Sequence, residues 1–205
     1  MAPRVVDKDE KRRRIAAAAL QVFGEKGFDR TRMADVASLA QVGKGTLYEY
    51  YPDKDSLFQG AFTEMMHGFL EKLAPVLESD APALDLLAET AHRTVREMID
   101  VDHIYPFFLE YLLFASRRPE ANHVMAEVLT DYRAMTAALL ERAAATGAIS
   151  PEADVEMLAA VFAAWFDGAI LHWVVIPGGP EIEKMADSFI EMFFRGLGAG
   201  KGGEA

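Results

Sequence analysis

The chain has 205 residues, of which 51% are hydrophobic and 26% are charged, so its composition is neither that of a disordered chain nor that of a fibre. It contains no cysteine, which excludes disulfide frameworks, cysteine-ligated zinc, iron–sulfur clusters and thiol catalysis. The net charge of −11 is uneven: residues 1–60 carry 11 basic and 9 acidic side chains (+2), whereas residues 61–205 carry 10 and 23 (−13). The overall acidity therefore does not exclude a polyanionic partner for the head of the chain.

Apolar residues recur at helical spacing along most of the chain, and no segment shows the sustained alternation of a β-strand. The first predicted helix spans residues 7–26, with four basic side chains on its outer face and Gly27 as its C-cap. A second helix begins with Thr31 as its N-cap and ends at about residue 40. After an interruption at residues 41–43, a short element covers residues 45–51. Residues 52–53 then start a long helix that reaches residue 73.

The second half of the chain is also predicted to be helical. Residues 80–82 start a helix that runs to about residue 102, and Pro106 acts as a helix breaker in the aromatic segment 104–114. Pro119 starts a helix that Gly147 ends, and Ser150 and Pro151 start another that reaches about residue 176. Residues 177–180 turn the chain into a last helix. We expect an all-α protein of about nine helices with a head (residues 1–52), a larger domain (residues 53–197) and a disordered tail (residues 198–205).

One apolar stretch, residues 157–176, is long enough to cross a bilayer. Asp167 at its middle would cost about 2.5–3.5 kcal/mol there. The flanking residues provide no Lys or Arg anchor. We therefore expect a buried helix and no membrane association. Because no apolar stretch follows a basic start at the amino terminus, we also expect no secretory signal.

The most informative segment is residues 31–57, which is predicted to form a helix, a tight turn and a second helix. The first helix has a small apolar inner face, and Val42 in the turn closes the core. Leu47 and Tyr51, four residues apart, give the second helix its inner face. Such a short helix buries little apolar area but has the right shape to enter a DNA major groove. The alternative is a plain helical hairpin with tyrosines on its surface.

Residues 12–58 resemble the DNA-binding domain of the TetR family of bacterial transcriptional repressors. The matching residues are Phe28, Thr31, Val36, Ala37, Ala40, Val42, Gly45, Thr46, Leu47, Tyr48, Tyr50, Tyr51, Lys54 and Leu57. The sequence departs from the family pattern at two positions. Gln41 stands where the turn usually has Gly, so a left-handed conformation there is mildly strained. Gly43 stands where Ser or Thr usually caps the recognition helix.

The resemblance implies a set of DNA contacts. These are Thr31 and Arg32 to phosphate, Lys44, Gly45 and Tyr48 at base edges, and Thr46, Tyr50 and Lys54 on the backbone. Because a reader of one half-site needs a second copy about 34 Å away, the resemblance also implies a homodimer. The predicted dimer surface is two stripes in the last two helices, namely Phe162, Phe166, Ala169 and Trp173, and Met185, Phe189, Met192 and Gly196. Core packing within one chain is the alternative for both stripes.

The middle of the chain is dense in aromatic residues, and the resemblance implies a ligand pocket there. The candidate lining residues are Phe69, His92, Val95, Arg96, Ile99, Phe107, Phe108, Tyr111, Met125, Leu129, Tyr132 and Trp165. For each of these residues, ordinary core packing is the alternative. The five histidines are scattered without metal-binding spacing, so no metal, cofactor or catalytic site is expected.

Taken together, the resemblance implies a cytoplasmic, ligand-responsive repressor that is not an enzyme. Its dimer binds a near-palindromic operator in double-stranded DNA and is released by an apolar or amphipathic small molecule. The alternatives are a helical enzyme that acts on a small molecule and a membrane-anchored sensor that uses residues 157–176 as its anchor.

Overall fold

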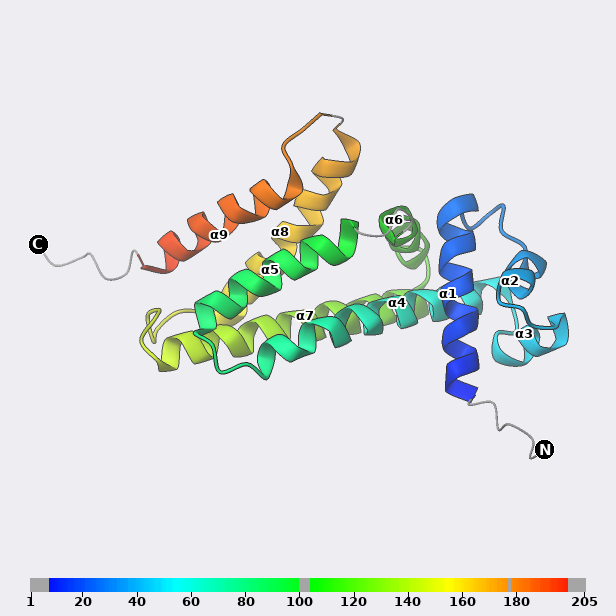
Figure 1. The fold of residues 1–205 in the computed structure, drawn as a ribbon, viewed down its shortest axis with the longest axis horizontal. Coiled ribbons are helices and arrows are strands. Elements are labelled where there is room, and N and C mark those ends of the chain that lie inside the picture. The colour runs from blue at the N-terminus through cyan, green and yellow to red at the C-terminus, as the bar shows by residue number, and fades with distance from the viewer. Residues whose placement is uncertain (1–7, 100–103, 177, 199–205) are drawn as a thin grey trace, which may run out of the picture. The chain divides into compact units, whose positions relative to one another are not determined.

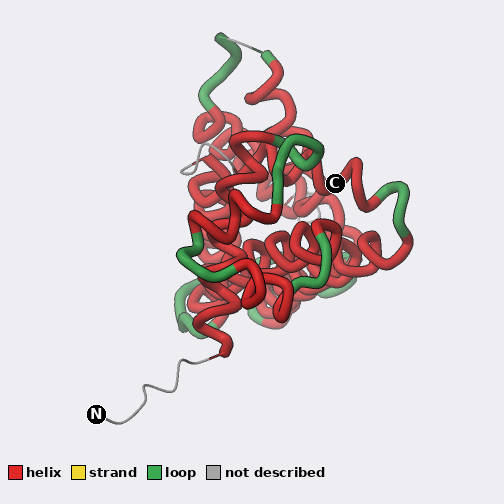
Figure 2. Tube along the Cα trace, turned by 90° about the vertical axis from the view of Figure 1, so that its right-hand side faces the viewer, coloured by secondary structure: helices red, strands yellow, loops and turns green. Residues whose placement is uncertain are grey.

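The computed structural model describes residues 8–99, 104–176 and 178–198, which form nine α-helices and no strand (Figures 1 and 2). The helices are α1 (Lys8–Lys26), α2 (Met33–Leu39), α3 (Lys44–Tyr50), α4 (Lys54–Leu77), α5 (Ala83–Ile99), α6 (Ile104–Ala115), α7 (Pro119–Ala145), α8 (Val155–Val175) and α9 (Ile182–Gly198). The all-α prediction is therefore confirmed. The predicted tail lies outside the described residues except for Gly198, which ends α9.

Local sequence signals account for several helix ends, and two of the predicted signals are wrong. Gly27 and Gly147 follow α1 and α7 with φ of 78° and 71°, the left-handed conformation that ends a helix. Pro106 lies in the first turn of α6, where no intrahelical N–H bond is lost, so it does not break the helix. Residues 150–153 form a turn, because the Ser150 hydroxyl accepts a local bond from the Glu152 N–H. The helix begins only at Val155, after Asp154 caps it.

The chain divides into two compact units, and the first comprises the described parts of residues 1–69 and 101–127. This unit is larger than the predicted head, since it also contains α6 and the first part of α4. Its core is an aromatic cluster formed by Phe23, Phe28, Phe58, Phe62, Phe107, Tyr111 and Phe114. Tyr111 stacks on Phe62, donates to the Ala121 carbonyl at 3.2 Å, and has its pKa raised to about 12 by burial.

The second unit comprises the described parts of residues 70–100 and 128–205. Here α5 packs against α8 and α9, and α8 also packs against α9. The rings of Phe162 and Phe189 meet with centroids 5.5 Å apart. A hydrogen bond of 3.1 Å joins the Thr94 hydroxyl of α5 to the Tyr132 hydroxyl of α7. The predicted functional boundary between residues 52 and 53 stays a prediction.

Candidate nucleic-acid interface

The turn between α2 and α3 is closed by backbone hydrogen bonds. The Val42 N–H donates to the Ala37 carbonyl at 3.0 Å, and the Gln41 N–H donates to the Ser38 carbonyl at 3.2 Å. This pattern ends a helix when the residue after the C-cap is left-handed, and Gln41 has φ of 52°. The strained left-handed conformation predicted at Gln41 is therefore present. It directs the chain from α2 into α3 (Figure 1).

The short helix α3 has one buried face and one exposed face. Leu47 is completely buried and Tyr51, the C-cap, is almost so, which fixes the rotation of the helix. Lys44, Gly45 and Tyr48 are exposed on the other side, and Tyr48 exposes 49% of its surface. Gly43 is the N-cap and provides no side-chain bond, as the sequence predicted. An exposed lysine and tyrosine thus stand on a helix that the core holds in place.

The remaining predicted DNA contacts differ in exposure. Arg32 is exposed, whereas Thr46 and Tyr50 are half-buried. Thr31 is buried, and its hydroxyl donates to the Gly27 carbonyl at 2.8 Å. Its predicted side-chain contact with phosphate is therefore wrong, because the hydroxyl is already used inside the protein. The N-cap of α2 is Arg32, whose N–H donates to the Asp35 carboxylate at 3.3 Å, so the prediction of Thr31 as the cap is also wrong.

Two charged residues hold the turn between α1 and α2. Lys54, at the start of α4, donates from Nζ to the carbonyls of Phe28 at 2.9 Å and Asp29 at 3.3 Å. The same ammonium lies 4.4 Å from the centre of the Phe28 ring. Glu110 of α6 accepts from the Phe28 N–H at 2.7 Å. Sequence reasoning missed Glu110, because a partner 82 residues away leaves no local signal.

Tyr51 joins α3 to α1 and α4. A Cβ added to Gly60 of α4 would lie 2.9 Å from the Cζ and the hydroxyl oxygen of Tyr51, and closer still to Cε1, so only glycine fits beside the ring. Burial raises the pKa of Tyr51, and its buried hydroxyl has no hydrogen-bond partner. The Arg12 guanidinium of α1 lies 5.6 Å from the centre of the ring. The end of α3 is therefore held by contacts with both α1 and α4.

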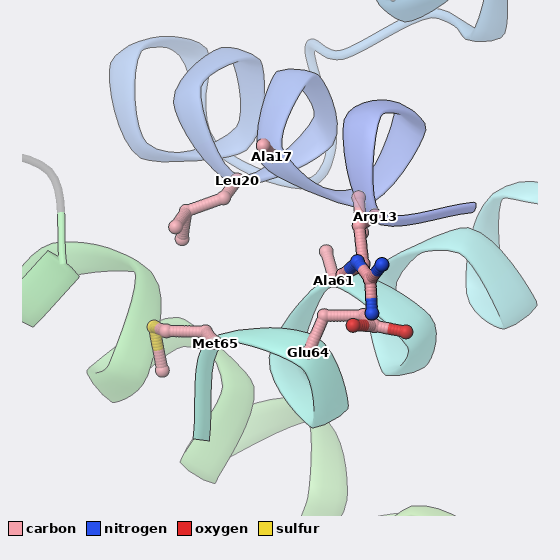
Figure 3. A pocket seen from close by; sticks show the side chains of 7 residues that line it. Arg13, Ala17, Leu20, Ala61, Glu64 and Met65 are labelled. Carbon is pink, nitrogen blue, oxygen red and sulfur yellow. The ribbon is translucent and has the colours of Figure 1, made fainter. Parts of the chain in front are cut away.

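A cleft of about 220 Å³ lies between α1 and α4 within the first unit (Figure 3). Its walls are mostly apolar, and Arg13 and Glu64 line one end of it. The other lining residues are Ala16, Ala17, Leu20, Ala61 and Met65. Arg13 thus points toward α4 and lies beside Glu64 at that end of the cleft (Figure 3).

The predicted ligand-pocket residues divide between the two units. Phe69, Phe107, Phe108, Tyr111 and Met125 belong to the first unit, and His92, Val95, Arg96, Ile99, Leu129, Tyr132 and Trp165 to the second. Phe107 and Tyr111 have no accessible surface, so they are core residues here and their prediction as lining residues is corrected. His92 lies 2.8 Å from the Asp187 carboxylate, and Arg96 faces outward beside Glu89.

The predicted dimer stripes are also partly core. Phe162, Phe166, Ala169 and Phe189 are buried within the single chain, so the prediction that they contact a partner is corrected. Trp173, Met192 and Gly196 are exposed and Met185 is half-buried. A different face of α8 carries a stripe of exposed apolar and small residues, which are spaced alternately four and three residues apart along the helix. It consists of Met157, Val161, Ala164, Gly168, Leu171 and Val175.

Among the described helices, α8 is long and apolar enough to cross a membrane when judged by length and composition alone. About a third of its most apolar window is buried inside the protein. Its aromatic residues pack on α9, since Trp165 stacks on Phe189 with centroids 4.3 Å apart. These contacts pack one face of α8 inside the protein, and much of its remaining apolar surface is exposed.

Comparison with known proteins gives a consistent result along the chain. Residues 15–61 match the model of bacterial regulatory proteins of the tetR family, and residues 88–195 match the C-terminal domain of BetI-type transcriptional repressors. The fatty acid metabolism regulator protein of Bacillus subtilis is 23% identical over 190 residues, which cover 93% of this chain and 97% of that protein. The regulator TtgR of Pseudomonas putida is 26% identical, with 91% and 92% covered.

The likeness extends to solved structures. The regulator FadR from Bacillus subtilis, solved in complex with stearoyl-CoA, superposes with a TM-score of 0.73 at 20% identity. The match covers 90% of this chain and 98% of that one. At this level of identity, the superposition shows a shared fold. The two relatives described above are named as regulators, of fatty acid metabolism in one case and of transcription in the other.

Proposed function

Because the chain belongs to the TetR family and is a ligand-responsive transcriptional repressor, we propose that α3 reads the bases of a near-palindromic operator in the DNA major groove. The observation that carries this proposal is the exposure of Lys44, Gly45 and Tyr48 on a helix whose other face is fixed by buried Leu47. A lysine can donate to the acceptors of guanine and a tyrosine to phosphate or base oxygens, while glycine allows a close approach.

The other contacts are assigned according to exposure. Arg32 is free to bind phosphate at the start of α2, and Thr46 and Tyr50 can donate to the backbone from the edges of α3. Thr31 and Lys54 instead position the head, because their polar groups bond to carbonyls of the turn between α1 and α2. In this assignment, replacing Lys54 removes its hydrogen bonds to the turn between α1 and α2, and DNA binding weakens because that turn is less firmly held.

The proposed active form is a homodimer that places two α3 helices one turn of DNA apart. The support for this is the exposed stripe of α8 defined above, from Met157 to Val175. Its alternating steps of four and three residues keep one apolar seam along a helix, and Ala164 and Gly168 in the middle let a second helix approach closely. The exposed Met192 of α9 adds apolar surface in the same unit.

The proposed effector is an apolar or amphipathic small molecule in a cytoplasmic protein that catalyses no reaction. Support comes from the stearoyl-CoA bound to the FadR structure and from the name of the fatty acid regulator. The effector prefers a conformation in which the two heads are wrongly spaced for the operator. A coupling free energy of about 1–3 kcal/mol is typical of such a switch. His92, Arg96, Leu129 and Trp165 keep exposed surface and are the residues proposed to meet it.

The test of DNA reading is the variants Lys44→Ala and Tyr48→Ala, assayed by fluorescence anisotropy on an operator selected from random duplexes with the wild-type protein. Each lost base contact costs about 1–3 kcal/mol and occurs twice per dimer, so we expect affinity to fall by at least about 30-fold. The control Lys72→Ala removes a cation that pairs with Glu97 in the second unit, and it should leave affinity unchanged. If Lys44→Ala and Tyr48→Ala both bind like the wild type, α3 does not read the operator.

The test of the dimer is Val161→Glu, which introduces a charge into the α8 stripe. Light scattering during size-exclusion chromatography should show a dimer for the wild type and a monomer for the variant. Ala134→Glu changes an exposed position of α7 outside the stripe and should remain dimeric. A Val161→Glu protein that is still a dimer would place the interface elsewhere.

A further inference from the structure

The start of α1 carries a concentration of positive charge that the proposed α3 contacts do not use. Five of the seven residues from 8 to 14 are basic, and two are acidic, a balance of +3. The basic residues are Lys8, Lys11, Arg12, Arg13 and Arg14, and all are exposed except Lys11, which is half-exposed. Among the residues that the structure describes, the ion pairs involve other side chains and none of these five. By contrast, Lys72, Arg93 and Arg195 each pair with an acidic side chain.

The contact between Arg12 and Tyr51 places one of these basic side chains beside the end of α3. Tyr51 is the C-cap of α3, and the Arg12 guanidinium lies over its ring. Lys8 is four residues, about one helical turn, before Arg12 and so shares its face. Lys11 is three residues after Lys8 and therefore neighbours Lys8 on the helix surface. Arg13 lies on another side, at the cleft between α1 and α4 (Figure 3). The first turns of α1 therefore present cations beside the end of the proposed reading helix.

From this placement we propose that Lys8, Lys11 and Arg12 bind phosphates of the duplex that flank the bases read by α3. The inference rests on the proposed function, and its partner is the sugar–phosphate backbone of double-stranded DNA. When a helix lies in a DNA groove, the sugar–phosphate backbone runs along the edge of that groove, so unpaired cations beside the helix can bind its phosphates. These contacts neutralise phosphate whatever the base sequence. Such contacts strengthen binding to every duplex and leave the choice of operator to α3.

This division of roles has a measurable signature. The logarithm of DNA affinity falls linearly with the logarithm of salt concentration, with a slope of about 0.9 for each phosphate neutralised. Removing three contacts from each head should lower that slope by about 2.7 per head, or about 5 per dimer. The loss should be the same on operator and on unrelated duplex. Loss of a base contact, in contrast, weakens the operator complex selectively.

The experiment compares the wild type with the triple variant Lys8→Gln/Lys11→Gln/Arg12→Gln by fluorescence anisotropy between 50 and 300 mM KCl. Two duplexes are used, the selected operator and a scrambled duplex of the same length. We expect at least a tenfold weakening on both duplexes at 150 mM KCl and a shallower salt slope, with the ratio of the two affinities unchanged.

A matched pair of single variants separates position from net charge. Arg12→Gln and Arg13→Gln remove the same charge from neighbouring residues of one helix, but Arg12 lies over Tyr51 at the end of α3, whereas Arg13 lines the cleft between α1 and α4. Arg12→Gln should lower the salt slope and Arg13→Gln should leave it at the wild-type value. Circular dichroism checks that both variants keep their helical content.

The outcomes distinguish the two proposals. If Lys44→Ala loses operator preference while the triple variant keeps the wild-type slope, the phosphate contacts of α1 are refuted and the reading helix stands. If Arg13→Gln and Arg12→Gln lower the slope equally, the effect is one of net charge and the proposed face is wrong. If the wild type binds neither duplex in any salt, the proposed function itself fails.

Discussion

Gly60 of α4 provides the sharpest test of the packing that holds α3. Its replacement by alanine adds one methyl group at a position where the Cζ and hydroxyl oxygen of Tyr51 would lie 2.9 Å away, with Cε1 nearer. Ordinary carbon contacts are about 3.5–4.0 Å, so the ring must move. Tyr51 exposes only 3% of its surface, which leaves the ring little room.

Two opposing effects decide the sign of the change in stability. A glycine in a helix interior costs roughly 0.5–1 kcal/mol relative to alanine, so the replacement gains that amount. Inserting a methyl group into a packed site costs about 1–3 kcal/mol, and a contact this short belongs at the upper end. We therefore expect Gly60→Ala to destabilise the protein by about 2 kcal/mol. Gly68→Ala in the same helix, where an added Cβ meets nothing within 4 Å, should instead stabilise it by about 0.5–1 kcal/mol.

Urea denaturation followed by circular dichroism measures both changes in the free energy of unfolding. Tyr51→Leu removes the ring, so Gly60→Ala should cost less in that background, and a double-mutant cycle gives the coupling. Equal effects of Gly60→Ala and Gly68→Ala would refute the argument, because only the first glycine lies against a ring.

Three further predictions concern the same unit. Tyr51→Phe removes a buried hydroxyl that has no hydrogen-bond partner, so urea denaturation should show unchanged stability or a gain of up to about 1 kcal/mol. Glu110→Ala leaves the Phe28 N–H without its charged acceptor and should cost about 1.5–3 kcal/mol, whereas Glu110→Gln keeps an acceptor and should cost less. Hydrogen bonding to Lys26 lowers the pKa of the Asp35 carboxyl, so an NMR titration should find it below the usual range and Lys26→Gln should raise it. Because the folded-state pKa is depressed, the stabilisation by Asp35 is complete above its unfolded pKa and is lost as the pH falls through the folded value.

The sequence allowed the helices and the turn at Gln41 to be predicted because both depend on near neighbours. Three signals lie close together along the sequence: the helical spacing of apolar residues, the glycines after α1 and α7, and the helix-turn-helix motif of the head. The incorrect boundary before α8 has the same origin. Ser150 and Pro151 carry a general helix-start signal, but Asp154 provides the bond that starts the helix, to the Met157 N–H at 3.0 Å.

The faces of helices were harder to predict, because a periodic pattern gives a stripe but not its neighbour. Phe162 and Phe166 belong to a valid stripe of α8, and the structure uses that stripe for the core of the chain. The exposed seam lies on another side and contains Ala164 and Gly168, which are small and carry little hydrophobic signal. Similarly, Thr31 has the right type for a DNA contact, and only the fold reveals that its hydroxyl turns inward.

The bond from the Phe28 N–H to Glu110 has a consequence for protein engineering. The simplest chimaeric regulator would join the reading head of one protein to the sensing part of another at a single junction. In this chain, a junction after residue 52 would separate Phe28 from Glu110. A junction after residue 69 would also separate Phe58 from Phe107, whose ring centroids lie 5.0 Å apart. A transplant that retains native stability must therefore carry two segments, with α6 taken from the same parent as α1.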